Sequence, residues 1–297
     1  LDSVHTIRDV AVVGVRPHYL TPSQTLAGTA LQNLSTTSVA DALKYFSGVQ
    51  IKDYGGLGGL KTVNVRSLGS QHVGVYLDGI RITNAQNGQI DLGRYSLSNM
   101  ESVALYNANR NERLQSASEY ASAATVYLQT RRPDSTALSV EYGTGSFGLQ
   151  KLKAYLSFKN ILFVDAEYQR TDGDYPFRFK SASEDTVGKR RNSDISFYRI
   201  EAAGFYKGFT AHAYYYSSER GLPGPVVRRL SDQWDSTDRQ WDRNFFVQSS
   251  YRHAWDRFSL KTNLKYAYDW LRYLQDPSTN AATMYCDNHY RQQDLYA

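Results

Sequence analysis

The chain has a single cysteine, Cys286, among its 297 residues. One thiol cannot close an intrachain disulfide or supply a cysteine-rich metal site, so both are excluded. The six histidines are scattered without metal-ligand spacing, and no Ser, Asp and His residues form a nucleophile motif. The sequence therefore contains no recognisable catalytic set or metal centre, and we expect no cofactor.

Long hydrophobic runs are missing as well. No apolar run approaches the roughly 18–20 residues of a membrane-spanning helix, which excludes a helical membrane protein. Mean hydropathy is −0.54; a membrane β-barrel stays compatible with this value, because its strands face lipid only at alternate positions. Basic residues are interspersed with acidic ones at a net charge of +5. Since no basic block is present, we expect no nucleic-acid partner.

Tyrosine is abundant, with 24 residues, and the chain changes character near residue 131. After Pro133, segments of about ten residues alternate apolar with polar side chains, which predicts half-buried β-strands. Short turns on one rim and long loops on the other are typical of outer-membrane barrels. A soluble β-sandwich or soluble barrel is the alternative. The joints and loops that separate the strands are Gly145–Phe147, Asn160, Lys207–Gly208, Thr171–Asn192 and Gly221–Gln240.

Shorter and more mixed elements precede residue 131. A helix is predicted over Ser38–Phe46, because Ser38 can cap its N-terminus and Asp41 lies in its first turn. Gly48 follows as a stop signal. A strand at Val49–Ile51 comes next, so this part of the chain is predicted to be a small α+β domain.

The stretch Thr62–Gly79 predicts β-structure most clearly. Its valines alternate with polar or small residues, and we interpret it as two short strands joined by a turn at Leu68–Ser70. Asp78–Gly79 is a turn dipeptide, and the apolar run Ile80–Ile82 follows it directly. This pattern predicts a hairpin.

Four segments, in order and at family spacing, resemble the plug domain of TonB-dependent outer-membrane receptors: Thr37–Leu43, Gly48–Ile51, Val63–Gly69 and Val73–Arg81. The later strands resemble that family in architecture only. The chain departs from the family pattern in several turns, where the local geometry is expected to differ. These departures are Ser47 for the usual Pro, Ser67 for the usual Gly, Asn107–Arg110 for Arg-Gly-Pro, and Ser122–Ala124 for a Gly pair.

The resemblance implies an α+β plug domain followed by antiparallel transmembrane β-barrel strands, as a partial barrel of a 22-stranded family. Residues 1–19 would be an N-terminal extension, 20–131 the plug, and 132–297 the first seven or eight barrel strands. A whole barrel at about 20–25 residues per strand needs some 450–500 residues. We therefore expect the chain to be part of a longer receptor.

A segment near the start is placed like a TonB box, which adds a strand to the energy-coupling protein through main-chain hydrogen bonds. It consists of Asp9, Val10, Ala11, Val12 and Val13. Charged residues beside the plug elements are candidates for an ionic latch between plug and barrel, with ordinary solvated charge as the alternative: Arg66, Arg81, Glu101 and Arg113.

Two loops with Gly-rich or Asn/Gln-rich tips are expected at the outward end of the plug. Their side chains suit a bulky polar ligand. The alternative is that they are flexible loop residues without a role in binding. These residues are Tyr54, Leu57, Asn84, Gln86, Asn87 and Gln89. Structural calcium in an outer loop, bound by Asp172, Asp174, Glu184 and Asp185, is a further candidate, although a solvated loop is favoured.

The implied function is TonB-dependent uptake of a scarce, bulky nutrient across the outer membrane of a Gram-negative bacterium. The plug most resembles those of cobalamin (vitamin B12) receptors, and a ferric siderophore or haem receptor is the alternative. The implied partners are the TonB energy-coupling protein, outer-membrane lipids and the cobalamin or iron-chelate ligand, with a surface lipoprotein as a further candidate. An alternative of another class is a soluble β-rich carbohydrate-binding protein, which would be extracted from cells without detergent.

Overall fold

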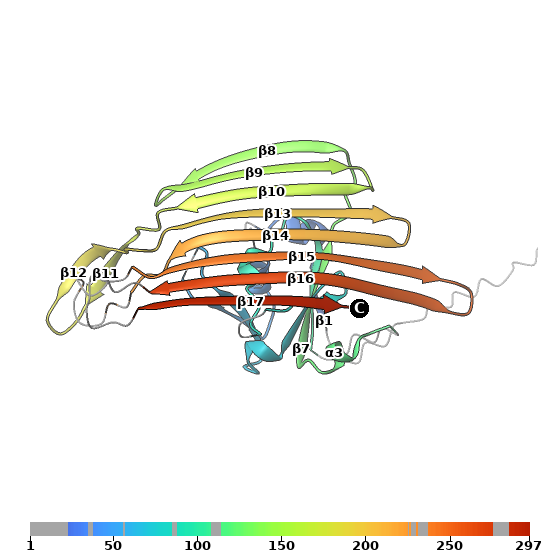
Figure 1. The fold of residues 1–297 in the computed structure, drawn as a ribbon, viewed down its shortest axis with the longest axis horizontal. Coiled ribbons are helices and arrows are strands. Elements are labelled where there is room, and N and C mark those ends of the chain that lie inside the picture. Colours follow the sequence, from blue (N-terminus) through green and yellow to red (C-terminus); the bar gives the residue numbers. More distant parts are fainter. Residues whose placement is uncertain are drawn as a thin grey trace, which may run out of the picture.

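The computed structural model describes residues 23–34, 38–55, 57–84, 88–107, 114–224, 226, 230, 237–275 and 285–297. A small α+β domain ends with a strand at Thr130, and an antiparallel sheet of eight strands begins at Ala137. The small domain lies against one face of this large, curved sheet (Figure 1). None of the described helices is long and apolar enough to span a membrane.

In its described residues, the small domain contains two sheets and three short helices. The larger sheet has the order β1-β6-β7-β4-β5, in which only β4 and β7 are parallel. Its strands are β1 Ser23–Ala27, β4 Val73–Leu77, β5 Ile80–Arg81, β6 Met100–Tyr106 and β7 Ala124–Thr130. The second sheet pairs β2 Val49–Asp53 with β3 Lys61–Val65. The helices are α1 Gly28–Gln32, α2 Val39–Leu43 and α3 Ala117–Tyr120, with 3₁₀ turns η1 Ser70–His72 and η2 Leu92–Arg94.

The predicted helix is confirmed, although it is shorter than expected. Ser38 caps α2, because its Oγ accepts a hydrogen bond from the Asp41 amide at 3.3 Å. Burial opposes the charge on Asp41, but hydrogen bonds from Lys44 and Ser38 outweigh it and lower the pKa of this carboxyl below its ordinary value. The chain then turns at Gly48, whose φ is +75°.

Of the two strand pairings predicted for the stretch Thr62–Gly79, one is confirmed and one is wrong. The Asp78–Gly79 turn does join a hairpin, in which Leu77 pairs with Ile80. The strand before it, β3, does not pair with β4 as predicted; β3 pairs with β2, and β4 pairs in parallel with β7. The reason is the intervening turn, where Arg66 and Ser67 have φ values of +50° and +61° and redirect the chain into another sheet.

This turn leads to a stability prediction. Ser67 has a left-handed conformation that costs a non-glycine residue about 1–2 kcal/mol. We expect Ser67→Gly to raise the free energy of unfolding by about 1 kcal/mol, seen as a higher Tm of the complete protein in detergent. Ser70→Gly is the matched control: Ser70 has a negative φ, so glycine there should lower the Tm. Equal shifts of the two variants would contradict the argument.

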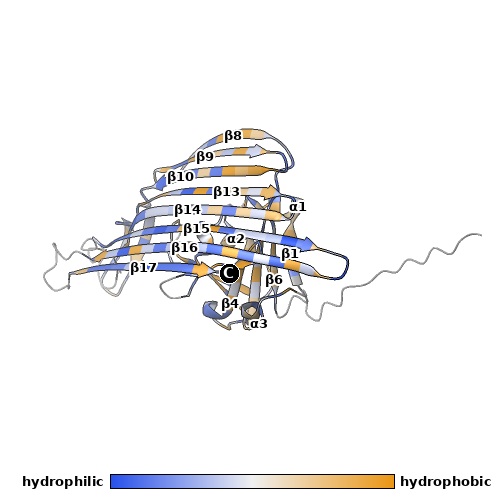
Figure 2. Ribbon diagram, turned by 45° about the vertical axis from the view of Figure 1, so that its right-hand side comes forward, coloured by the Kyte–Doolittle hydropathy of each residue, from blue (hydrophilic) through white to orange (hydrophobic). Residues whose placement is uncertain are grey.

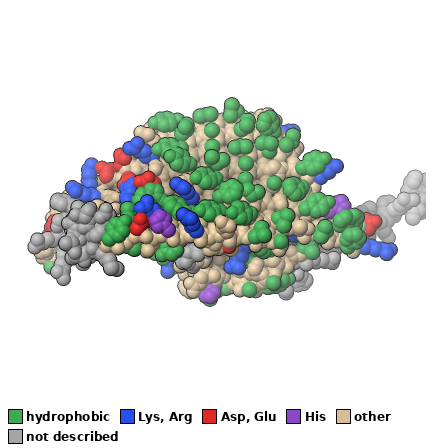
Figure 3. Space-filling view, in the orientation of Figure 1, with side chains coloured by type: hydrophobic (Ala, Val, Ile, Leu, Met, Phe, Trp, Pro, Cys, Tyr) green, Lys and Arg blue, Asp and Glu red, His purple; other side chains and the backbone are tan. Residues whose placement is uncertain are grey.

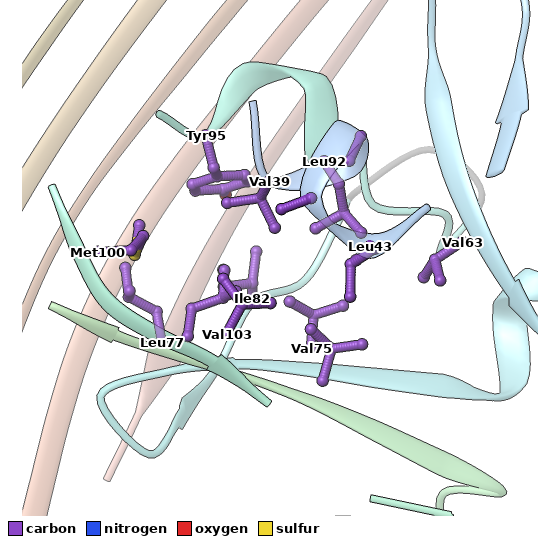
Figure 4. Packing of buried hydrophobic residues seen from close by; sticks show 14 of the residues in the cluster. Val39, Leu43, Val63, Val75, Leu77, Ile82, Leu92, Tyr95, Met100 and Val103 are labelled. Carbon is purple, nitrogen blue, oxygen red and sulfur yellow. The ribbon is translucent and has the colours of Figure 1, made fainter. Parts of the chain in front are cut away.

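The core of the small domain lies between α2 and its sheets. Val39 and Leu43 of α2 pack toward Val75, Leu77 and Val103 (Figure 4). The same cluster of buried residues continues into the large sheet through Phe197, Tyr214, Tyr216 and Phe246. The two parts therefore share one apolar contact layer.

The large sheet has the strand order β17-β16-β15-β14-β13-β10-β9-β8, so each strand pairs with its chain neighbour apart from the inserted hairpin β11–β12. The strands are β8 Ala137–Gly145, β9 Leu149–Phe158, β10 Leu162–Thr171, β13 Ile195–Tyr206, β14 Phe209–Gly221, β15 Arg239–Ala254, β16 Ser259–Gln275 and β17 Cys286–Tyr296. The hairpin consists of β11 Pro176–Lys180 and β12 Asp185–Lys189.

One joint lies on the opposite edge from the one expected. In an antiparallel sheet successive joints alternate between edges. The tight joints at Asn160 and Lys207–Gly208 share one edge, here called the turn rim, with Trp255–Phe258. The short turn at Ser146–Gly148 lies on the other edge, the loop rim, together with the long segments. Its nearness to that rim is also seen in the hydrogen bond from the Thr171 hydroxyl to the Phe147 carbonyl.

Side chains of the large sheet point alternately to its two faces. Tyr214 and Tyr216 are buried against the small domain, whereas Tyr215 between them is 38% exposed. We call the face toward the small domain inner and the opposite face outer. Hydrophilic and hydrophobic residues are interspersed along the strands of the sheet (Figure 2), and the outer face is predominantly apolar across the middle of the sheet (Figure 3). Its exposed hydrophobic residues include Leu138, Val140, Leu152, Leu156, Tyr198, Ile200, Tyr206, Phe209, Phe245, Val247, Leu264 and Tyr266.

Candidate functional site

An arginine of the small domain reaches across to the large sheet. Arg94, at the end of η2, lies 3.0 Å from Asp91 Oδ2 in its own domain and 3.1 Å from Asp242 Oδ1 on β15. Its guanidinium also donates to the Asn244 side chain and stacks over the Tyr216 ring, 4.9 Å from the centroid. One cation thus connects a turn of the small domain with two strands of the sheet.

The surroundings of Arg94 keep it charged. Only 14% of its side chain is exposed. This burial opposes the charge, but the carboxylates of Asp242 and Asp91 outweigh it and hold the pKa of the guanidinium well above its ordinary value. The Arg94 carbonyl accepts further hydrogen bonds from the Tyr214 hydroxyl at 3.0 Å and from Arg199 at 3.1 Å. Both the side chain and the backbone of Arg94 are therefore held by the sheet.

A second cluster surrounds His212 of β14, nearer the turn rim. His212 and Glu201 are each 2% exposed. The imidazole Nδ1 lies 3.5 Å from Asp78 Oδ2 in the Asp78–Gly79 turn, and Nε2 lies 3.0 Å from Glu201 Oε1 on β13. The second contact has ion-pair distance without hydrogen-bond alignment. The histidine therefore lies between a carboxylate of the small domain and one of the sheet.

Hydrogen bonds fix both carboxylates around His212. Asp78 accepts from the Thr130 hydroxyl at 2.7 Å and from the Thr130 amide at 2.9 Å. Glu201 accepts from Asn99 of the small domain at 2.8 Å. Buried charges are tolerated when they are paired and hydrogen-bonded in this way. The cluster is thus a polar link enclosed between the two parts of the chain.

Other polar side chains of the sheet bind backbone atoms of the small domain. Gln248 donates to the Leu77 carbonyl at 3.0 Å, and Lys265 donates to the Arg81 carbonyl at 2.8 Å. These contacts hold both strands of the β4–β5 hairpin against the sheet. The described contacts between the small domain and the sheet are non-covalent. Separating the two would expose buried charges and apolar rings to water.

Residues 19–116 match the family model of the TonB-dependent Receptor Plug Domain. The small domain is thus similar to a receptor plug domain, over about a third of the chain. This match supports the resemblance stated from the four motifs, and the sheet that follows the plug agrees with the predicted barrel strands.

Three solved structures share this fold. The ferric citrate transporter FecA in its unliganded form has a TM-score of 0.54 at 18% identity, over 86% of this chain and 40% of that one. The ferric yersiniabactin uptake receptor FyuA from Yersinia pestis has 0.58 at 18%, over 93% and 45%. The FrpB iron transporter from Neisseria meningitidis has 0.60 at 13%, over 91% and 44%. The chain thus spans less than half the length of each. A plug followed by antiparallel barrel strands, the predicted fold class, is confirmed.

Three of the residues predicted as a latch, Arg66, Arg81 and Glu101, form no ion pair with the described residues of the sheet. Arg66 and Glu101 are exposed, and neither has an ion pair with another described residue. Arg81 contributes its carbonyl, to Lys265, and not its guanidinium. Arg113 lies outside the described residues. A role of these side chains as a latch stays a prediction, and the described ionic contacts belong to Arg94, Asp78 and their partners.

The predicted ligand residues are placed in part. Tyr54 and Leu57 are 60% and 45% exposed, on a loop whose Gly58 carbonyl accepts from Arg220 near the loop rim. Asn84 lines a cleft with Asn244 and Asp269, and Gln89 is half-buried. Gln86 and Asn87 lie outside the described residues, as does the predicted TonB box at residues 9–13. The structure thus places the first loop at the rim that carries the long loops.

A cavity of about 70 Å³ lies beneath this first loop, beside Leu57, Gly58 and Arg94. It has room for a few water molecules only. A bulky ligand would therefore contact the outward side of the loop and not this cavity.

The proposed calcium ligands are engaged elsewhere. Asp174 pairs with Lys189 at 3.1 Å, and Asp185 pairs with Arg178 at 2.8 Å. Among the described residues, no group of three or more His, Cys, Asp or Glu side chains is placed to hold a metal ion.

Sequence reasoning missed Arg94, His212 and Glu201. A signal was present, because His212 and Glu201 occupy inward positions in otherwise alternating strands. A charged or imidazole side chain at such a position needs a partner, and the plug is what fills the inner side.

Proposed function

We propose that this chain is part of an active transporter in the outer membrane, in which the plug closes a barrel and moves when ligand is taken up. One observation carries the proposal: the plug packs on the inner face of the barrel strands through the clusters around Arg94 and His212. Such an interface holds the plug in the barrel in the absence of movement. When the plug moves, water can replace its polar contacts. No step requires covalent chemistry.

The outer face supports a position in a membrane. Its outward-pointing Tyr198 and Tyr206 lie on the same strand, β13, about 27 Å apart at roughly 3.4 Å per residue. At a strand tilt of about 40° this is about 20 Å along the membrane normal, within the apolar band of about 25 Å of outer-membrane barrels. The residues between them point apolar or small side chains outward. A soluble carbohydrate-binding protein would not expose such a band.

Coupling to energy would run through the start of the chain. The segment Asp9–Val13 is the proposed TonB box, and β1 is the first described strand of the plug after it. Among the described strands, β1 is an edge strand that pairs with β6 alone, so a pull on the preceding segment would act on this pairing. We propose that this loosens the plug sheet before the buried clusters separate.

For the transported ligand we propose a ferric chelate, with cobalamin as the second candidate. The three solved structures are a ferric citrate transporter, a ferric yersiniabactin uptake receptor and an iron transporter, and this favours iron. The short Gly-rich loop at Tyr54–Gly59 favours cobalamin. Both are bulky ligands that suit the exposed Tyr54 and Leu57.

The test is uptake by cells that produce the complete protein carrying this sequence. We expect Val10→Pro to abolish energised uptake while ligand binding is retained, because proline removes the amide needed for strand addition. Val10→Thr keeps that amide and is the matched control. Titration calorimetry with ferric chelates and with cyanocobalamin identifies the ligand. Extraction of the protein from cells without detergent, or uptake that is unchanged in Val10→Pro, would overturn the proposal.

A further inference from the structure

Two arginines flank one tryptophan on the outer face of the sheet. Trp270 of β16 pairs with Arg243 of β15 on one side and with Arg291 of β17 on the other. Directly paired residues of neighbouring strands point to the same face. The outward direction follows from Asn244 and Asp269, the next residues along, which contact the plug side through Arg94 and the cleft beside it.

Arg243, Trp270 and Arg291 lie at the edge of the apolar band that is nearer the loop rim. In the same row of paired residues stand Ser217 and, further along the sheet, Tyr198. The next outward row toward the turn rim holds Phe245 and Tyr268, and the next row toward the loop rim holds Trp241 and Arg272. In the view of the outer face, charged side chains of both signs gather at this end of the sheet, beside the apolar surface (Figure 3). The position is that of a membrane–water boundary.

Among the residues that the structure describes, the two flanking arginines have no carboxylate partner. Arg272 pairs with Asp287 at 2.9 Å, and Arg239 pairs with Asp194 and Glu219. Arg243 and Arg291 are exposed, and no described carboxylate lies within ion-pair distance of either. The Arg243 guanidinium stacks over the Trp270 ring, 4.7 Å from its centroid. This stacking orients the guanidinium, and no described carboxylate occupies its N–H groups.

We propose that Arg243, Trp270 and Arg291 form a binding site for the phosphate group of an anionic membrane lipid. Guanidinium groups bind phosphate through paired, charge-assisted hydrogen bonds. Trp270 supplies an amphipathic ring at the level of the headgroups, and Phe245 and Tyr268 below it offer an apolar surface to the acyl chains. This inference rests on the membrane position in the proposed function, and it adds a specific lipid contact near the loop rim.

The test is native mass spectrometry of the complete protein, released from mixed micelles that contain phosphatidic acid and phosphatidylcholine in equal amounts. We expect the parent protein to retain phosphatidic acid in preference. Removing one guanidinium should weaken retention on the order of tenfold. Arg243→Gln and Arg291→Gln should each show this loss, and the double variant should show no preference between the two lipids.

Arg170→Gln is the matched control, because Arg170 also points outward near the loop rim but lies on β10, away from Trp270. A loss in Arg170→Gln as large as in Arg243→Gln would mean general charge attraction and overturn the site. Displacement of the lipid by millimolar inorganic phosphate would equally overturn it, in favour of a soluble anion. A parent protein that is incorporated into the mixed micelles but retains both lipids equally refutes this inference alone. Failure to be incorporated into the micelles at all would refute the membrane position as well.

Discussion

Arg94→Ala is expected to lower the free energy of unfolding by about 3–5 kcal/mol, the loss typical when one partner of a buried ion pair is removed. Asp91 and Asp242 lie 3.0 and 3.1 Å from nitrogens of the Arg94 guanidinium. The variant would leave both carboxylates buried without this shared cation. It would also open a gap beside the Tyr216 ring. Thermal unfolding of the complete protein in detergent measures the effect.

Arg178→Ala is the matched control for this measurement. Arg178 also pairs with a carboxylate, Asp185, through two hydrogen bonds of 2.8 Å, but 70% of its side chain is exposed. Exposed pairs contribute about 0–1 kcal/mol, so Arg178→Ala should leave the Tm almost unchanged. If Arg94→Ala unfolded at the same temperature as Arg178→Ala, the plug would not depend on the Arg94 contacts for its position.

The elements that could be predicted from sequence are those set by neighbours along the chain. Ser38 and Asp41 lie three residues apart, and their mutual hydrogen bonds define the start of α2. The Asp78–Gly79 turn likewise depends on its own backbone, with φ values of +52° and +84°. The long strands could be predicted from the alternation of apolar and polar side chains, because this pattern depends only on whether each side chain faces inward or outward. Local signals of this kind are complete within a short window of residues.

The errors concern pairings between segments that are distant in sequence. The alternating valines of β3 and β4 are compatible both with one hairpin and with strands in two separate sheets. The pairing partners β2 and β7 place the two strands in separate sheets. Arg66 lies in a recognisable motif, yet Arg94 is the plug arginine that meets a described carboxylate of the sheet. His212 and Asp78 could not be connected from sequence, because their contact requires the docked position of the plug.

His212→Ala is expected to loosen the plug at the turn rim. Without the imidazole, Asp78 and Glu201 face each other across a cavity with no cation between them, and like charges in a buried site repel. We expect a loss of about 2–5 kcal/mol in plug stability. In liposomes that contain the complete protein, a loosened plug should increase the passive leak of a polar dye. The leak is measured against protein without substitution.

The contact between His212 and Asp78 can be isolated by a double-mutant cycle. Asp78→Asn alone should also raise the leak, and the two substitutions together should add less than the sum of their single effects, by about 1–3 kcal/mol of coupling. His72→Ala is the control for loss of a histidine, because His72 is exposed on η1 of the plug and its backbone carbonyl, not its ring, makes the contact to Ala123. Additive effects of His212→Ala and Asp78→Asn would contradict the link. In that case the two residues would stabilise the plug and the sheet separately, and Gln248 and Lys265 would be left as the contacts that hold the hairpin in place.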